Sequence, residues 1–183
     1  MKAGLIAINL AAIIFGTAAL FGKLPVSPVW IVALRGAFAC IALLLLGLIR
    51  GGLVAVRSKA QIKALIMTGV LLAVHWLTFF ASVQLAGVAI ATLTFAAFPL
   101  FTVILVAWSK RKVPTPLEIG AGIAILIAVG MLVDIHADGL ALLGAVSGFV
   151  SAIAFAYFGI KAKRLTGELP PLTVSLGQNL SWH

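Results

Sequence analysis

The chain has 183 residues, of which 63% are apolar and only 9% are charged, and its formal net charge is +9. A soluble domain has about half apolar and about a quarter charged residues, and one of this size cannot bury so much apolar surface. The composition therefore excludes a soluble enzyme, a disordered chain and a nucleic-acid-binding module, and indicates the lipid bilayer as partner. The single cysteine, Cys40, offers neither a disulfide framework nor a zinc site.

Long apolar segments follow one another along the chain. A spanning helix needs about 20 such residues to cross roughly 30 Å of hydrocarbon. Six segments approach that length, at residues 3–22, 28–49, 64–85, 88–108, 116–133 and 139–160, and a seventh stretch at 172–182 is too short to span. The segments lack the alternation of barrel strands, so we predict an all-α, polytopic helical membrane protein.

Basic residues gather in alternate connectors, which is typical of cytoplasmic loops. Eleven of the 13 basic residues fall on the same predicted side as the N-terminus: Lys2, Arg50, Arg57, Lys59, Lys63, Lys110, Arg111, Lys112, Lys161, Lys163 and Arg164. The connectors at 84–87 and 134–138 have no basic residue. We therefore predict a cytoplasmic N-terminus, and the basic excess requires no nucleic-acid partner.

A weak internal repeat appears when the chain is shifted by 140 residues. The shift pairs Gly4 with Gly144, Ala12-Ile13 with Ala152-Ile153, Phe15 with Phe155, and Lys23 with Lys163. A unit of five helices is odd in number, so its second copy enters the membrane inverted, as in many secondary transporters. We predict a first five-helix repeat at 1–134 and an incomplete inverted repeat at 135–183, and thus expect a partial chain. The alternative is a six-helix protein with a peripheral amphipathic tail.

Arg35 lies seven residues into the second segment, about 10 Å deep at 1.5 Å per residue. An arginine at the centre of a spanning helix costs about 2.5–3.5 kcal/mol on insertion scales. We therefore expect this side chain to face a cavity or a polar network. The alternative is a side chain that extends to the outer membrane surface.

Thr68, His75 and Ser82 recur every seven residues in the third segment and share one helix face. A polar stripe in lipid is expected to face protein or water. His75 could bind a solute or relay a proton. The alternative is a neutral histidine that is hydrogen-bonded to a neighbouring helix.

Pro99 lies inside the fourth segment, where it cannot donate a backbone hydrogen bond. The carbonyl of Phe95 is then left free, and we predict a kink. Kinked helices often line transporter sites, and Phe98 lies beside this one. The alternative is a tolerated proline among packing aromatic rings.

The first and sixth segments carry further polar groups. Asn9 and Thr17 give the first segment a polar face, and Tyr157 lies on the sixth. The sixth segment also has a ridge of small residues that predicts close helix packing, at Gly144, Gly148, Ala152 and Ala156.

Several of these features occur together in a known family. The residues that carry the resemblance are Phe15-Gly16-Thr17, Lys23, Pro28, Arg35, His75-Trp76, Phe79-Phe80, Val88-Ala89-Ile90, Phe98-Pro99, Gly120 and Gly130. In these residues the chain resembles EamA-type proteins of the drug/metabolite transporter superfamily. It departs from them at 109–112, where the family often carries an acidic residue and this chain reads Ser-Lys-Arg-Lys.

The resemblance implies ten helices in two inverted halves, in the bacterial inner membrane. It also implies transport of small metabolites, often amino acids or related solutes. Alternating access of the two repeats is the mechanism expected of inverted repeats. The expected substrate-cavity residues are Asn9, Thr17, Arg35, His75, Trp76, Phe79, Phe98 and Tyr157, with Pro99 as the kink.

Two other classes of function remain as alternatives. The chain could be a non-transporting scaffold, or a half-transporter that needs a partner chain or a second copy. An intramembrane enzyme is disfavoured, because no Gly-x-Ser-x-Gly sequence surrounds Ser147. No acidic residue lies at midspan, so this half lacks a carboxylate-based proton relay. No phosphate-binding loop appears, so we expect no direct use of ATP, and we expect no cofactor and no metal.

Overall fold

The computed structural model describes residues 5–6, 9–10, 17–111, 113–132 and 139–181. Its elements are η1 (Ala19–Lys23), α2 (Pro28–Arg50), α3 (Lys59–Phe95), α4 (Phe98–Lys110), α5 (Pro116–Leu132), α6 (Gly139–Leu165) and α7 (Pro171–Leu180). None of the described residues forms a strand, so the all-α prediction is confirmed. The first predicted segment lies mostly outside the described residues.

Three helices in the described part of the chain are long and apolar enough to cross a membrane, namely α2, α3 and α6. They correspond to the second, third and sixth predicted segments. The fifth becomes α5, whose 17 residues fall slightly short of a full span. Proline stands first in α2, α5 and α7, where its missing N–H costs no helical hydrogen bond.

The fourth predicted segment is not one continuous helix. Gly87 has φ 83° and ψ 167°, a conformation that only glycine adopts readily, and it bends α3 so that residues 88–95 take a new direction. The chain then turns at Ala96 and Ala97 before α4 begins, with Pro99 in its first turn. The break therefore lies next to the proline, in agreement with the predicted kink.

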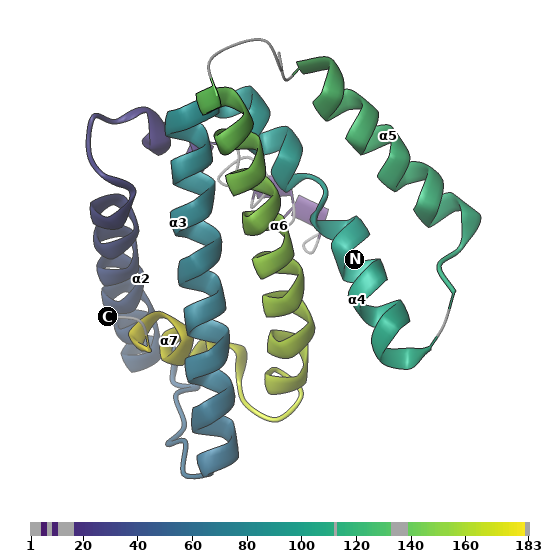
Figure 1. Ribbon diagram of the computed structural model, residues 1–183. Coiled ribbons are helices and arrows are strands. Elements are labelled where there is room, and N and C mark those ends of the chain that lie inside the picture. The colour runs from purple at the N-terminus through teal and green to yellow at the C-terminus, as the bar shows by residue number, and fades with distance from the viewer. Residues whose placement is uncertain (1–4, 7–8, 11–16, 112, 133–138, 182–183) are drawn as a thin grey trace.

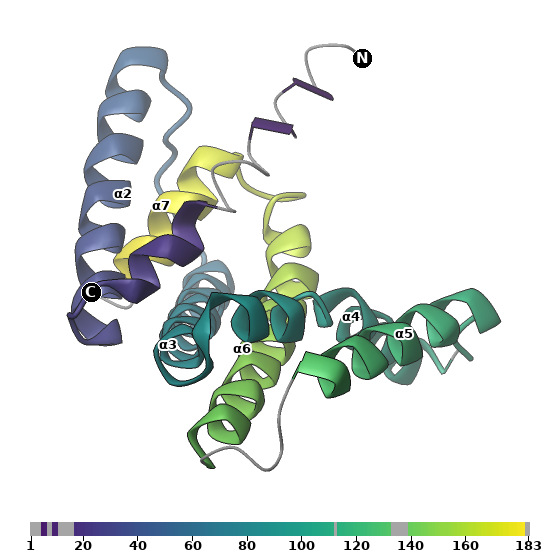
Figure 2. The same ribbon diagram turned by 90° about the horizontal axis from the view of Figure 1, so that it is seen from above.

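Helices α3 and α6 lie side by side and form the centre of the molecule (Figure 1). Helix α2 lies beyond α3, and the short α7 contacts both of them. Helices α4 and α5 extend from the opposite side, which is clearest from above (Figure 2). The helix ends that carry most of the basic residues, at Arg50, Lys59, Lys110 and Arg164, lie toward the lower end of Figure 1. We call this the basic end.

The small-residue ridge of α6 permits its close approach to α3. All four ridge residues are buried, as predicted: Gly144, Gly148, Ala152 and Ala156. A Cβ atom added to Gly144 would collide with Ala86, whose backbone nitrogen would lie only 2.9 Å away. One added to Gly148 would collide with the Thr94 hydroxyl and lie 3.0 Å from Ser82 Oγ. Since only a hydrogen atom fits at these two positions, the glycines set the distance between the helices.

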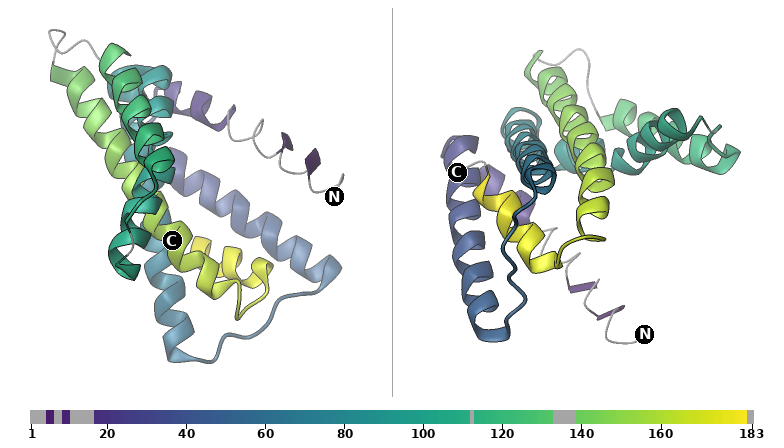
Figure 3. Two further views of the ribbon diagram at one scale, coloured as in Figure 1. Left: turned by 90° about the vertical axis from the view of Figure 1, so that its right-hand side faces the viewer. Right: turned by 90° about the horizontal axis from the view of Figure 1, so that it is seen from below.

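Helix α7 is not the peripheral tail considered above. It packs against both α2 and α3, as the side and lower views also show (Figure 3). The Thr173 hydroxyl accepts a hydrogen bond from the Val54 N–H at 3.1 Å and donates to the Gly52 carbonyl at 3.2 Å. The buried Gln178 side chain donates to Thr68 Oγ1 at 3.2 Å. These bonds join α7 to α3 and to the connector that follows α2.

We expect Gly148→Ala to destabilise the protein by about 1–3 kcal/mol through overpacking. The Thr94 hydroxyl is held by the carbonyls of Ile90 and Ala91, so it cannot easily move aside. Thermal unfolding of detergent-solubilised protein measures the effect. The matched control on the same helix is Gly159→Ala, where nothing lies within 4 Å of the added carbon. Equal melting temperatures for the two variants would contradict this account of the contact.

Candidate functional site

Arg35 is the charged residue nearest the middle of α2, and its guanidinium stacks on an aromatic ring. The carbon Cζ lies 3.6 Å from the centroid of the Trp76 ring on α3, in a cation–π contact. Its Nη1 atom is buried and makes no hydrogen bond, and no ion pair to Arg35 occurs within the described residues. These contacts favour the cavity-facing interpretation over a side chain that extends to the membrane surface.

A cavity of about 510 Å³ lies beside this arginine, between η1, α2 and α3. Its described lining is mainly apolar: Phe21, Ile31, Leu34, Phe38 and Phe80 are the larger contributors. Arg35 and Thr17 add the polar side chains. The sequence therefore forms an apolar groove with one positive charge in its wall, and Phe21, Leu34 and Phe38 are more than half exposed. We call it the Arg35 cavity.

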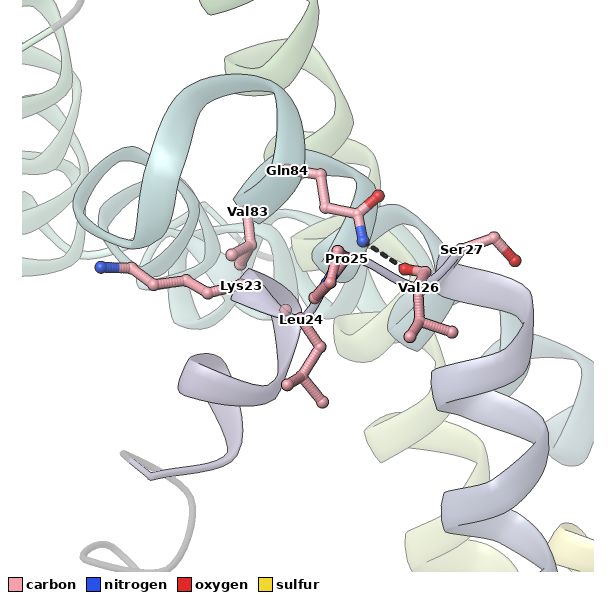
Figure 4. Close-up of a pocket in the computed structure, with 8 residues that line it drawn as sticks. Lys23, Leu24, Pro25, Val26, Ser27, Val83 and Gln84 are labelled. Carbon is pink, nitrogen blue, oxygen red and sulfur yellow. Dashed lines mark hydrogen bonds between the residues drawn. The ribbon is translucent and has the colours of Figure 1, made fainter.

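A second, more open pocket of about 570 Å³ lies at the end of the bundle opposite the basic end (Figure 4). Its floor is the connector between η1 and α2. The Gln84 side chain donates a 2.8 Å hydrogen bond to the Val26 carbonyl and so ties this connector to α3. Leu24 and Val26 line both this pocket and the Arg35 cavity, so the connector separates the two spaces.

His75 is held inside the bundle, on the other side of Trp76. It is 2% exposed, and its Nδ1 lies 2.8 Å from Ser151 Oγ and 3.3 Å from the Ser151 carbonyl oxygen on α6. The carbonyl can only accept, which favours the tautomer whose Nδ1–H donates to Ser151. The contacts thus agree with a histidine hydrogen-bonded to a neighbouring helix. A role in solute binding stays a prediction.

Aromatic rings surround this histidine and connect α3, α4 and α6. The ring centroids of Phe95 and Phe155 lie 4.9 and 4.7 Å from that of His75. The Phe98 ring stacks on that of Phe95, with the centroids 5.3 Å apart, and packs edge-on against that of Phe155, with the centroids 5.2 Å apart. Phe79 packs edge-to-face on Phe95 at 5.7 Å. The break before α4 therefore brings its aromatic residues into contact with α3 and α6.

The structure brings most of the predicted cavity residues together. Arg35 contacts Trp76, and Trp76, His75 and Phe79 contact one another. Phe98 joins this series through Phe95, which lies against both Phe98 and His75. Thr17 lines the Arg35 cavity together with Arg35. Asn9 is exposed and donates to the Leu5 carbonyl of its own segment at 2.8 Å. Tyr157 lies near the basic end, where Lys161 Nζ is 5.2 Å from its ring centroid.

Ser151, Phe155 and Phe80 belong to this region but were not among the predicted cavity residues. Ser151 and Phe155 are one turn apart on α6 and therefore share a face, which also carries the small-residue ridge. That shared face was a signal available in the sequence. Phe80 gave no such signal, because its place in the cavity wall depends on where η1 packs.

The stripe of Thr68, His75 and Ser82 is fully buried, as its spacing predicted. Thr68 is hydrogen-bonded to Gln178 on α7, and His75 is hydrogen-bonded to Ser151 on α6. No group of three or more His, Cys, Asp or Glu side chains that could hold a metal occurs in the described ranges.

Comparison with known families gives one result. The model of the EamA-like transporter family matches residues 2–133, which is more than half of the chain. The chain belongs to the EamA-like transporter family. No curated protein and no solved structure gives a significant match. Family membership makes this an integral membrane protein of the drug/metabolite transporter superfamily, and EamA is a family of transporters, not of enzymes.

We expect Ser151→Ala to lower the free energy of unfolding by about 0.5–2 kcal/mol, because the buried His75 loses its side-chain partner. Thermal unfolding in detergent measures this loss. Ser109→Ala is the control, since Ser109 is exposed at the end of α4. A Ser151→Ala variant as stable as the control variant would show that the His75 contact contributes nothing.

Proposed function

We propose that this EamA-like protein transports small metabolites, such as amino acids or related solutes, across the bacterial inner membrane. The observation that carries the proposal is the family match over residues 2–133. The Arg35 cavity is the site where the solute binds, because it combines an apolar groove with one charged group that has no acidic partner among the described residues. Concave, mostly apolar sites with few polar groups are typical of small-molecule binding.

The repeat organisation supports a mechanism by alternating access. Residues 1–134 form the first five-helix repeat, and residues 135–183 begin the second, inverted one. In support, the family match ends at residue 133, next to the proposed boundary. Rocking of one repeat against the other would expose the site to each side of the membrane in turn.

The basic end faces the cytoplasm and the pocket of Figure 4 faces the opposite side. The support is the clustering of helix ends that carry Lys and Arg at one end of the bundle (Figure 1). This orientation also places the N-terminus in the cytoplasm.

Reporter fusions test the orientation. We expect fusions within residues 51–58 and within 111–115 to report the cytoplasm, and fusions within 24–27 to report the outer side. A phosphatase that is active only outside the cytoplasm and a fluorescent protein that folds inside it give opposite readouts at each position. Opposite locations for 51–58 and 111–115 would contradict the fold as well as the orientation.

Because residues 135–183 only begin the second repeat, transport is tested with a protein in which that repeat is complete, purified and placed in vesicles loaded with a mixture of amino acids and organic acids. We expect solute efflux, measured by mass spectrometry, to fall by about tenfold or more in Arg35→Ala, because the charged group of the site is removed. Arg50→Ala, at the basic end of the same helix, is the matched control and should keep its efflux. Absence of efflux from the unaltered protein relative to empty vesicles would contradict the proposed function.

A further inference from the structure

We propose that the Arg35 cavity selects organic acids with a single carboxylate and an apolar body, and that the Arg35 guanidinium is the counter-charge for that carboxylate. The inference rests on the proposed transport of small metabolites, and within that range it favours organic acids over the amino acids named above. Four features of the cavity lead to it.

The first feature is the way in which the guanidinium is held. Its carbon Cζ lies over the Trp76 ring, 3.6 Å from the ring centroid. The N–H donors of a guanidinium lie at its edge, so stacking on a ring leaves them available. Nη1 is buried and has no hydrogen-bond acceptor. A buried donor without an acceptor is costly, and a carboxylate is the acceptor with which a guanidinium forms its strongest hydrogen bonds.

The second feature is the chemistry of the walls. Phe21, Leu34, Phe38 and Phe80 line a space of about 510 Å³ around the one charged group. An apolar or aromatic body buried against these side chains gains transfer free energy in proportion to its buried area. The cavity therefore suits a solute with a charged group at one end and hydrocarbon at the other.

The third feature is charge balance. Arg35 supplies one positive charge, and none of the described residues lining the cavity is acidic. A phosphate dianion would leave an uncompensated negative charge in an apolar space, and the ammonium of an amino acid would lack a counter-ion there. A monocarboxylate without an amino group pairs its one negative charge with Arg35 and brings no positive charge that would need a counter-ion.

The fourth feature is access. Leu24 and Val26 form the boundary between the Arg35 cavity and the open pocket of Figure 4. Lys23 also lines that pocket, with its side chain extended away from the Gln84–Val26 bond. The described part of this pocket has a basic residue and no acidic one, which suits the approach of an anion.

Isothermal titration calorimetry on the protein in lipid nanodiscs tests the proposal with three matched probes. These are 3-phenylpropionate, its uncharged amide and phenylalanine. We expect the acid to bind about tenfold or more tightly than either of the others, since a charge-assisted hydrogen bond is stronger than a neutral one. Arg35→Gln should remove this preference, whereas Arg50→Gln should retain it. Equal affinities for the acid and the amide, or an unchanged preference in Arg35→Gln, would overturn the proposal.

A second pair of variants keeps the charge and changes only the space. Leu34 and Leu45 are similarly exposed on α2, at 55% and 54%, but only Leu34 lines the cavity. Leu34→Trp should weaken binding of 3-phenylpropionate by about tenfold, and Leu45→Trp should leave it unchanged. Equal binding by the two variants would place the acid elsewhere and overturn the proposal.

Vesicle transport separates this proposal from the one it rests on. Binding of the acid that depends on Arg35, without any solute flux, would overturn the transport function and leave the binding site. Flux of neutral solutes that persists in Arg35→Gln would overturn the carboxylate site and leave the transport function.

Discussion

The close contact between α3 and α6 is the interaction on which the other features depend. Lipid tails are as apolar as leucine, so helices in a membrane gain little from hydrophobic burial against each other and rely on packing and hydrogen bonds. Gly144 and Gly148 supply the packing, and the His75–Ser151 pair supplies a buried hydrogen bond along the same seam. The aromatic rings around His75 can only meet because the two helices approach this closely.

Trp76 connects this seam to the Arg35 cavity. Its ring contacts His75 on the seam side, at a centroid distance of 4.8 Å, and the guanidinium on the cavity side. A charged group inside a membrane protein needs such a fixed surface, because a freely rotating arginine would extend toward water. The charged group of the proposed solute site is thus held by a side chain whose own place is set by α3 and α6.

Much of the fold was predictable because it depends on local patterns. Apolar length and an initial proline defined α2, and spacing by seven residues identified the buried stripe of α3.

The bend at Gly87 was not predicted, since a glycine between two apolar runs is also compatible with an ordinary loop. The stacking of Arg35 on Trp76 was also out of reach, because it joins residues that are far apart in the chain. The segment 88–108 was predicted as one span kinked at Pro99, and the structure divides it between the end of α3 and α4. The aromatic contacts of Phe95 and Phe98 with α6 favour the turn at Ala96 and Ala97.

The position of α7 has a consequence for the order in which the protein is assembled. Helix α2 has more extensive contact with α7 than with α3, and the hydrogen bond from Val54 to Thr173 spans 119 residues of sequence. At the usual rate of synthesis, about 5–20 residues per second, roughly 6–24 s separate the emergence of these two partners from the ribosome. During that interval α2, with its arginine, resides in the membrane before α7 exists. Helix α2 therefore completes its contacts with α7 only after α3 and α6 have been synthesised.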